Sequence, residues 1–156
     1  MKIYIASSWK NCQKCLDLSG QLRDWGHEVD CFCDASMGRY VFDYRDIGPI
    51  EEMDTIAFLD NPQSQAAFQE DQRWLNWCDA VVMVLPCGKS AHLEAGYAKG
   101  QNKFLVIYGP FVTGEVDVMY GFADDMVREG HLDRLKETLS HCDQLNKSLD
   151  QLNKKT

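Results

Sequence analysis

The chain of 156 residues has no long apolar stretch, since nowhere do about 18 apolar residues run together as a membrane-spanning helix would need. A basic leader is also missing, because the strand-like segment Lys2–Ala6 follows the first residue directly. We therefore expect a cytoplasmic protein with no membrane partner.

Positive charge is scarce. Sixteen Lys and Arg residues oppose 24 Asp and Glu residues, which gives a formal net charge of -8. Binding to a phosphate backbone needs Lys and Arg gathered on one face of a domain. We expect no nucleic-acid polymer as a partner.

The seven cysteines lack the spacing of a disulfide framework, so they indicate reduced thiols in a reducing compartment. Cys12, Cys15, Cys31 and Cys33 could together offer four thiolates to zinc. Two cysteines in one strand more often pack as small apolar side chains, and no histidine joins this group. We predict no metal site.

The chain does contain a regular alternation of strand-like and helix-like segments. Strands are predicted at residues 3–6, 28–33, 80–85 and 104–108, and helices at residues 12–25, 64–78 and 91–99. This alternation, with 45% hydrophobic residues, is typical of one α/β domain with βαβ units. We predict a doubly wound (Rossmann or flavodoxin-like) parallel sheet of about five strands with helices on both faces.

Two regions leave alternatives open. Residues 34–62 are polar and broken by glycines, yet they carry Arg39 and several aromatic residues. They suit either a lid over a flat heteroaromatic or anionic ligand or an exposed loop with a short helix. Residues 131–156, which follow the main domain at residues 1–130, predict one helix. Its leucines, with Asn146, either form a dimer seam or pack on the chain's own domain, and we favour packing.

The region from Met83 to Gly100 predicts a buried strand, a tight loop and a helix. We expect Ser90 to cap this helix and Glu94 to lie in its first turn, where the helix dipole stabilises an anionic carboxylate. Small neighbours at positions 91, 95, 96 and 98 would leave room for a ligand. Glu94 is the candidate nucleophile, and the alternative is an exposed glutamate favoured only by the dipole.

Asp71 is the second candidate, because it interrupts an apolar helix face formed by residues 67, 68, 74, 75 and 78. Its alternative role is to bind a backbone amide or Arg73. Two carboxylates about 5 to 5.5 Å apart perform glycosyl transfer with retention. Ser7, Ser8 and Ser90, at strand ends, offer hydroxyls and amides to a sugar or a phosphate.

Three separated motifs carry a resemblance to a known family. They are Ile3-Tyr4-Ile5-Ala6-Ser7-Ser8-Trp9, Asp71-Gln72-Arg73-Trp74-Leu75-Asn76-Trp77-Cys78-Asp79 and His92-Leu93-Glu94-Ala95-Gly96-Tyr97-Ala98. Together with the order of the elements, these motifs cover about two-thirds of the chain. In this part the chain resembles the nucleoside 2-deoxyribosyltransferases and the related 2'-deoxynucleoside 5'-phosphate N-hydrolases.

The resemblance implies a role for each matching residue. Glu94 matches the nucleophile, Asp71 the carboxylate that assists proton transfer at the base, Tyr4 the tyrosine that orients the nucleophile, and Trp9 a contact to the nucleobase. The Gly88-Lys89-Ser90 loop departs from the transferases, which carry an acidic residue there, and looks more like the phosphate-accepting hydrolases.

The resemblance further implies an enzyme without a cofactor that cleaves or transfers the N-glycosidic bond of a nucleoside or nucleoside 5'-monophosphate. It also implies a homo-oligomer. The same fold and glutamate chemistry serve NAD-cleaving hydrolases, and a nucleotide sensor without activity is a third reading.

Overall fold

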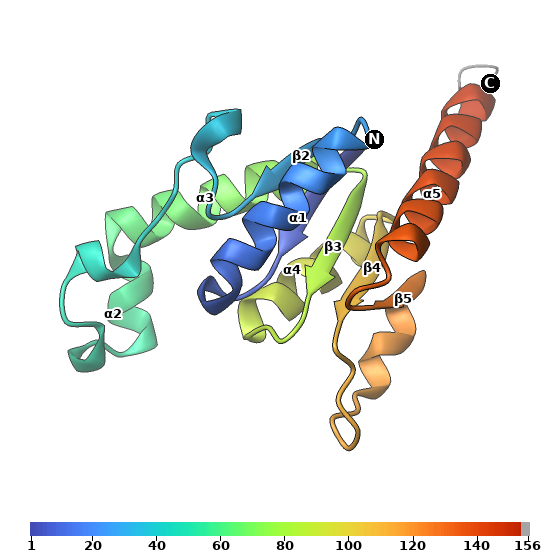
Figure 1. Cartoon of the computed structure of the whole chain (residues 1–156). Coiled ribbons are helices and arrows are strands. Elements are labelled where there is room, and N and C mark those ends of the chain that lie inside the picture. The colour runs from blue at the N-terminus through green and yellow to red at the C-terminus, as the bar shows by residue number, and fades with distance from the viewer. Residues whose placement is uncertain (154–156) are drawn as a thin grey trace.

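A computed structural model describes residues 1–153, apart from the side chains of residues 50, 150 and 153. Its centre is a five-stranded sheet in which every neighbouring pair is parallel, in the order β2-β1-β3-β4-β5 (Figure 1). The strands are β1 (Lys2–Ala6), β2 (Glu28–Cys31), β3 (Ala80–Val84), β4 (Phe104–Gly109) and β5 (Asp125–Arg128). This is the flavodoxin-like order of a doubly wound sheet, so the predicted fold class is confirmed.

The helices are α1 (Cys12–Asp24), α2 (Thr55–Asp60), α3 (Pro62–Trp77), α4 (Lys89–Gly100) and α5 (Leu132–Asn153). None of the helices within residues 1–153 combines the length and the apolar composition that crossing a membrane requires. The apolar pattern of the sequence does not reveal β5, because only Val127 is buried in this four-residue edge strand and the strand has no apolar run.

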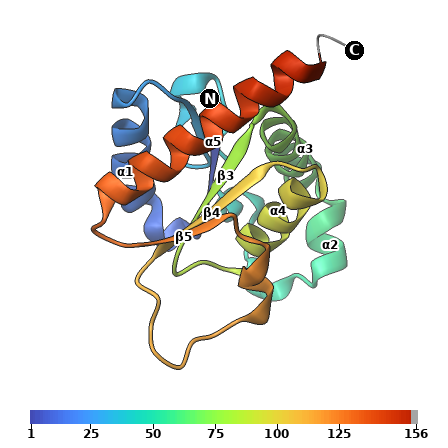
Figure 2. The same ribbon diagram turned by 90° about the vertical axis from the view of Figure 1, so that its right-hand side faces the viewer.

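Two apolar cores lie on opposite faces of the sheet, because successive side chains of a strand point to opposite faces. Ile3 and Ile5 of β1 pack with α1 and with the start of α5. Tyr4 and Ala6 of the same strand pack with α3 and α4. Figure 2 shows α1 on one side of the sheet and α3 and α4 on the other.

Helix α5 packs on its own domain over its first half. Leu135, Leu139 and Cys142 are buried, whereas Leu145 and Leu149 are exposed where the helix extends past the sheet (Figure 1). Residues 154–156 of the predicted helix lie outside the described residues. Association of copies through this helix stays a prediction, as does a division of the chain at residue 130.

The connecting segment between β2 and α3, residues 34–61, is built from short helical turns. They are η2 (Ala35–Met37), η3 (Tyr44–Ile47), η4 (Ile50–Glu52) and α2. Asp54 caps α2 by accepting a 2.8 Å hydrogen bond from the amide of Ala57. Asn61 then caps α3, and Pro62 fills its first position, where no amide donor is needed. Helix α3 therefore begins two residues before the predicted Ser64.

Candidate active site

The site begins with two polar residues side by side in the sheet. Tyr4 of β1 and Asp30 of β2 are register partners, so their side chains leave the sheet on the same face, toward α3. Both are fully buried. A buried carboxyl is costly unless it is paired or hydrogen-bonded, and therefore Asp30 requires a partner.

Arg39 of the connecting segment supplies that partner. Its Nη1 donates to Asp30 Oδ2 at 2.5 Å, and its Nη2 donates to Asp71 Oδ1 of α3. The guanidinium carbon also lies 5.7 Å from the centre of the Tyr4 ring. Arg39 is buried, although its neighbours Gly38 and Tyr40 are exposed, so this one side chain joins the connecting segment to β1, β2 and α3.

Glu94 of α4 belongs to the same electrostatic cluster. Its pKa is raised to about 7, first by burial and then by the negative charge of Asp71, although Arg39 and a hydrogen bond with Tyr4 act in the opposite direction. Burial likewise raises the pKa of Tyr4, with Glu94 and Asp71 as the next causes. The two candidate carboxylates and the candidate tyrosine therefore act on one another, as the sequence motifs implied.

Protonation is shared among the carboxyls of this cluster. Burial raises the pKa of Asp71, against the nearby charge of Arg39, and raises the pKa of Asp30 to about 7 in spite of the same arginine. Three carboxyls face one guanidinium, so they cannot all ionise at low cost in a buried site. A proton held on one of them at neutral pH is what a general acid needs.

The expected start of α4 is wrong. The helix begins at Lys89 with Gly88 as its N-cap, and no side chain caps it, so Ser90 is an exposed second residue rather than the cap. Glu94 is therefore the sixth residue, in the second turn. Because the dipole acts mainly within the first turn, burial prevails and Glu94 is not held as an anion by the helix end.

Three of the four small residues near Glu94 face the core instead of bordering a ligand space. Ala91, Ala95 and Ala98 are buried in the core between α4 and the sheet, so their small size lets the helix lie close to the strands. Gly96 is exposed on the other side. On α3 most of the predicted apolar face is buried, but Phe68 is 62% exposed.

The loop after β1 is fastened to the loop after β3. Ser7 Oγ donates to the Val84 carbonyl at 2.8 Å, while Asn11 Nδ2 donates to Ser7 Oγ at 3.1 Å and to the Pro86 carbonyl at 2.6 Å. Ser8 accepts a 3.3 Å hydrogen bond from the amide of Lys10 and so caps a 3₁₀ turn. Ser7 thus joins the two strand ends where a ligand is expected in this topology, and Ser8 shapes the loop.

A small cavity of about 50 Å³ adjoins Asp71. Its lining is mainly aromatic: Trp9, Phe32, Tyr40 and Phe42, with Ala67, Arg39 and Asp71. Trp9 also makes an edge-to-face contact with Phe32 at 5.2 Å. Ligand pockets usually enclose roughly 300 to 1,000 Å³, so this cavity has room for only about one or two water molecules, although the Asp71 side chain beside it is 36% exposed.

The sequence patterns do not single out Asp30, although a carboxylate between Val29 and Cys31 in a buried strand is a detectable signal. His92 of α4 stacks on Tyr120 with the ring centres 5.8 Å apart, and its Nδ1 lies 2.8 Å from the Gly88 carbonyl oxygen. Tyr120 thereby brings the 3₁₀ turn η5 (Val118–Phe122) of the same chain to α4.

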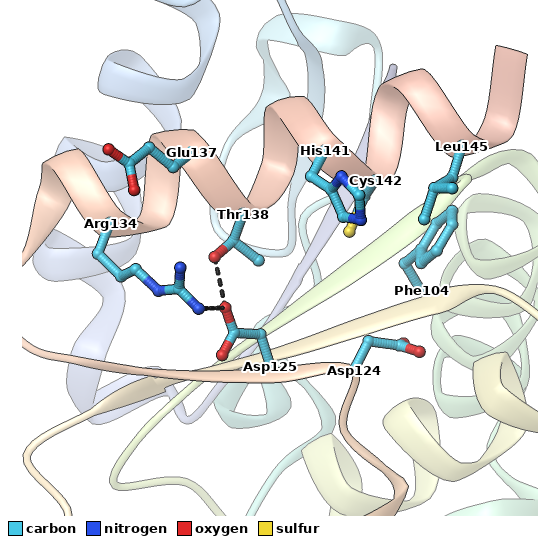
Figure 3. A pocket seen from close by; sticks show the side chains of 9 residues that line it. All are labelled: Phe104, Asp124, Asp125, Arg134, Glu137, Thr138, His141, Cys142 and Leu145. Atoms are coloured by element: carbon cyan, nitrogen blue, oxygen red, sulfur yellow. Dashed lines mark hydrogen bonds and ion pairs between the residues drawn. The ribbon is translucent and has the colours of Figure 1, made fainter.

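A larger hollow of about 540 Å³ lies elsewhere, between α5 and the edge of the sheet (Figure 3). Arg134 and Thr138 both point at Asp125 there, with hydrogen bonds of 2.8 and 2.5 Å. None of Tyr4, Asp71 and Glu94 lines it. Volume alone would favour this hollow as the binding site. The carboxyl groups with raised pKa values, however, belong to α3 and α4, and they define the candidate active site.

The four cysteines considered for zinc come from the α1 and β2 region, and the Sγ atoms of Cys31 and Cys33 lie 3.6 Å apart. All seven cysteines are free. Within residues 1–153, no group of three or more His, Cys, Asp or Glu side chains is arranged to hold a metal ion.

No protein-family model matches the chain. No curated protein matches its sequence. Solved structures do resemble it. The CMP N-glycosidase BcmB of Clostridium botulinum superposes with a TM-score of 0.56 at 13% identity, over 90% of this chain and 99% of its own. The 2-deoxyribosyltransferase of Bacillus psychrosaccharolyticus gives a TM-score of 0.59 at 18% identity, over 87% and 90%.

The response regulator TrrA of Thermotoga maritima also resembles the chain, with a TM-score of 0.51 at 14% identity over 90% of this chain and 97% of its own. This chain shares their fold. At such low identity the likeness extends no further, and a response regulator among the three shows that one fold serves different functions. The function must therefore be argued from the cluster itself.

Proposed function

We propose that the chain is an enzyme that cleaves or transfers the N-glycosidic bond of a nucleoside or nucleoside 5'-monophosphate, with Glu94 as the nucleophile. The observation that carries this proposal is that Glu94, Asp71 and Tyr4 act electrostatically on one another in one cluster, in which Arg39 contacts both Asp71 and the Tyr4 ring. Two of the proteins that share the fold are an N-glycosidase and a deoxyribosyltransferase, which supports the same reading.

In this mechanism Tyr4 donates a hydrogen bond to the ionised form of Glu94. Glu94 attacks the anomeric carbon, the bond to the base breaks, and the base takes a proton from Asp71 as it departs. Water, or a second base, then attacks the glycosyl-enzyme while Asp71 accepts a proton, and Glu94 is released. No step requires a cofactor.

The aromatic lining suits a base and the loop before α4 suits a phosphate. Trp9, Tyr40 and Phe42 present rings next to Asp71, where a nucleobase would have to lie to be protonated. Gly88, Lys89 and Ser90 are exposed at the amino end of α4, where backbone amides and a lysine favour an anionic group.

The test is to incubate the protein with deoxynucleosides, their 5'-monophosphates, ribonucleotides and NAD, and to measure free base by chromatography. We expect base release from a nucleoside or its monophosphate. Glu94→Gln should lower the rate by about 10³-fold or more, because it removes the nucleophile and keeps the shape of the side chain. Glu137→Gln, at an exposed position of α5 that borders the other hollow, is the matched control and should keep the rate.

The other outcomes would each replace the proposal. Nicotinamide release from NAD alone would identify an NAD-cleaving hydrolase. Retained nucleotide binding without release of any base would leave a sensor. Near-normal turnover by Glu94→Gln would remove Glu94 from the role of nucleophile.

A further inference from the structure

Arg39 occupies an unusual place for a residue on a surface segment. Its side chain is only 3% exposed, and it binds one carboxylate from β2 and another from α3. A surface arginine gains little from one ion pair, whereas a buried one must have its charge balanced. Asp30 is itself fully buried, and within residues 1–153 its side chain pairs with Arg39 alone. Desolvation offsets much of the Coulomb energy of such a buried pair.

The pair is not fully satisfied. Within residues 1–153, Asp30 Oδ1 and Arg39 Nε are buried without a hydrogen-bond partner. Unpaired buried polar atoms cost free energy, so the closed arrangement is held less firmly than a fully hydrogen-bonded pair would hold it. Arg39 also lines the small cavity beside Asp71, together with Tyr40 and Phe42 of the same segment.

We infer that Asp30 and Arg39 form a latch that closes the connecting segment over the candidate active site and positions Asp71. Asp30 holds the guanidinium, and the guanidinium holds the Asp71 carboxylate. The Asp71 side chain is 36% exposed, so solvent already reaches it, but the cavity of about 50 Å³ beside it is too small for a nucleobase. A base can enter there only when Arg39 withdraws and takes Tyr40 and Phe42 with it. The assignment of Asp71 to proton transfer rests on the proposed function, but the closure of the segment does not.

Few other contacts hold this part of the segment to the body of the protein. The Tyr40 amide donates to Glu70 Oε1 of α3 at 3.0 Å, and Phe42 packs on Phe58 within the segment itself. Release of Arg39 should therefore suffice to open residues 39–47. Arg45 lies in this stretch and pairs with Asp43, two residues away, so trypsin cleavage after Arg45 reports the opening.

The first experiment measures closure without any turnover. Trypsin cleavage after Arg45 is followed by mass spectrometry in the wild type, Asp30→Asn, Arg39→Met and the double variant. We expect both single variants to be cleaved about tenfold faster than the wild type, because each loses at least one charged hydrogen bond that holds the segment closed. If Asp30 acts through Arg39, the double variant is cleaved no faster than Arg39→Met. Arg134→Met, which removes the Arg134–Asp125 pair on α5, is the control.

The latch would be overturned if the wild type and both single variants were cleaved at the same rate. It would also be overturned if the rate increases of the two single variants multiplied in the double variant. Thermal unfolding excludes global destabilisation as the cause of faster cleavage. Should Arg39→Met fail to fold, Arg39→Lys replaces it, since a lysine keeps the charge but cannot bridge two carboxylates in the same planar way.

The second experiment measures the positioning of Asp71 directly, by carbon-13 NMR titration of its carboxyl group. Burial raises the pKa of Asp71, as does the charge of Glu70, whereas Arg39 and a hydrogen bond with Tyr4 lower it. Asp71 also interacts electrostatically with Glu94 and Asp30. Arg39→Met should raise the pKa of Asp71 by about one unit or more. An unchanged titration would show that Arg39 does not hold Asp71, whatever the outcome of the assays for base release.

Discussion

At the scale of single residues, burial rather than position in a helix determines the chemistry of Glu94. It lies in the second turn of α4, beyond the strongest effect of the helix dipole, and its pKa is raised to about 7. A nucleophile must be ionised to attack, so a fraction of the molecules is in the wrong state below neutral pH. Tyr4 counteracts this effect by hydrogen bonding to the ionised form.

We therefore expect kcat/KM to rise with pH through about pH 7, since this ratio reports the ionisation of the free enzyme. Tyr4→Phe removes a hydrogen bond that lowers the pKa of Glu94, so the rise should move to higher pH. Tyr97→Phe is the matched control, because the Tyr97 hydroxyl donates to Asn76 on the surface. A rise at the same pH in all three proteins would exclude Glu94 or Tyr4 from this role.

At the scale of elements, close packing at the ends of strands and helices holds the site in place. The sequence predicted most helices and strands, because the apolar residues recur with the period of each element. It did not predict β5, an edge strand with one buried residue. For residues 34–62 it left open a lid or an exposed loop with a short helix, because the helical turns there depend on polar caps such as Asp54. Such local caps carry no periodicity.

Two glycines make a matched test of this packing. A Cβ added at Gly109, at the end of β4, would clash with Leu85 Cβ, so Gly109→Ala should cost about 1 to 3 kcal/mol of unfolding free energy. Gly20→Ala lies in α1, with no atom within 4 Å of the added Cβ, and should stabilise by about 0.5 to 1 kcal/mol. Urea unfolding of both variants measures the two changes in unfolding free energy. Changes of the same sign would contradict the expected difference in packing.

Helix α5 offers a second test at this scale. Leu139 is fully buried against the sheet, so Leu139→Ala should lower the free energy of unfolding by about 2 to 5 kcal/mol. Leu149 is 54% exposed on the same helix, so Leu149→Ala should change it by less than about 0.5 kcal/mol in the monomer. A larger loss that depends on protein concentration would instead indicate that copies associate through this end of the helix.

At the scale of the whole molecule, the buried carboxyls make stability depend on pH. The pKa values of Asp30 and Glu94 are raised to about 7 in the folded protein from 3.8 and 4.5. The folded state therefore binds more protons than the unfolded state between about pH 4 and pH 7. Their contribution is complete below pH 4 and is lost as the pH rises through 7.

We expect the free energy of unfolding to fall between pH 5 and pH 7.5 in urea titrations. Asp30→Asn cannot take up this proton, so its decrease over the same range should be smaller than that of the wild type. Below about pH 4 the trend reverses, because hydrogen bonds and ion pairs lower the pKa values of Asp34, Glu70 and Asp143. Parallel curves for the two proteins would contradict the role of Asp30.

The sequence by itself determined the α/β alternation and pointed to Tyr4, Asp71 and Glu94, because periodicity and short motifs are local properties of the chain. Only the tertiary structure decided that Asp30 lies beside Tyr4 and that Arg39 reaches across to Asp71. Strand register and the path of a connecting segment bring together residues that are far apart in sequence. Burial, which sets the protonation of these groups, follows from that packing and from no local pattern.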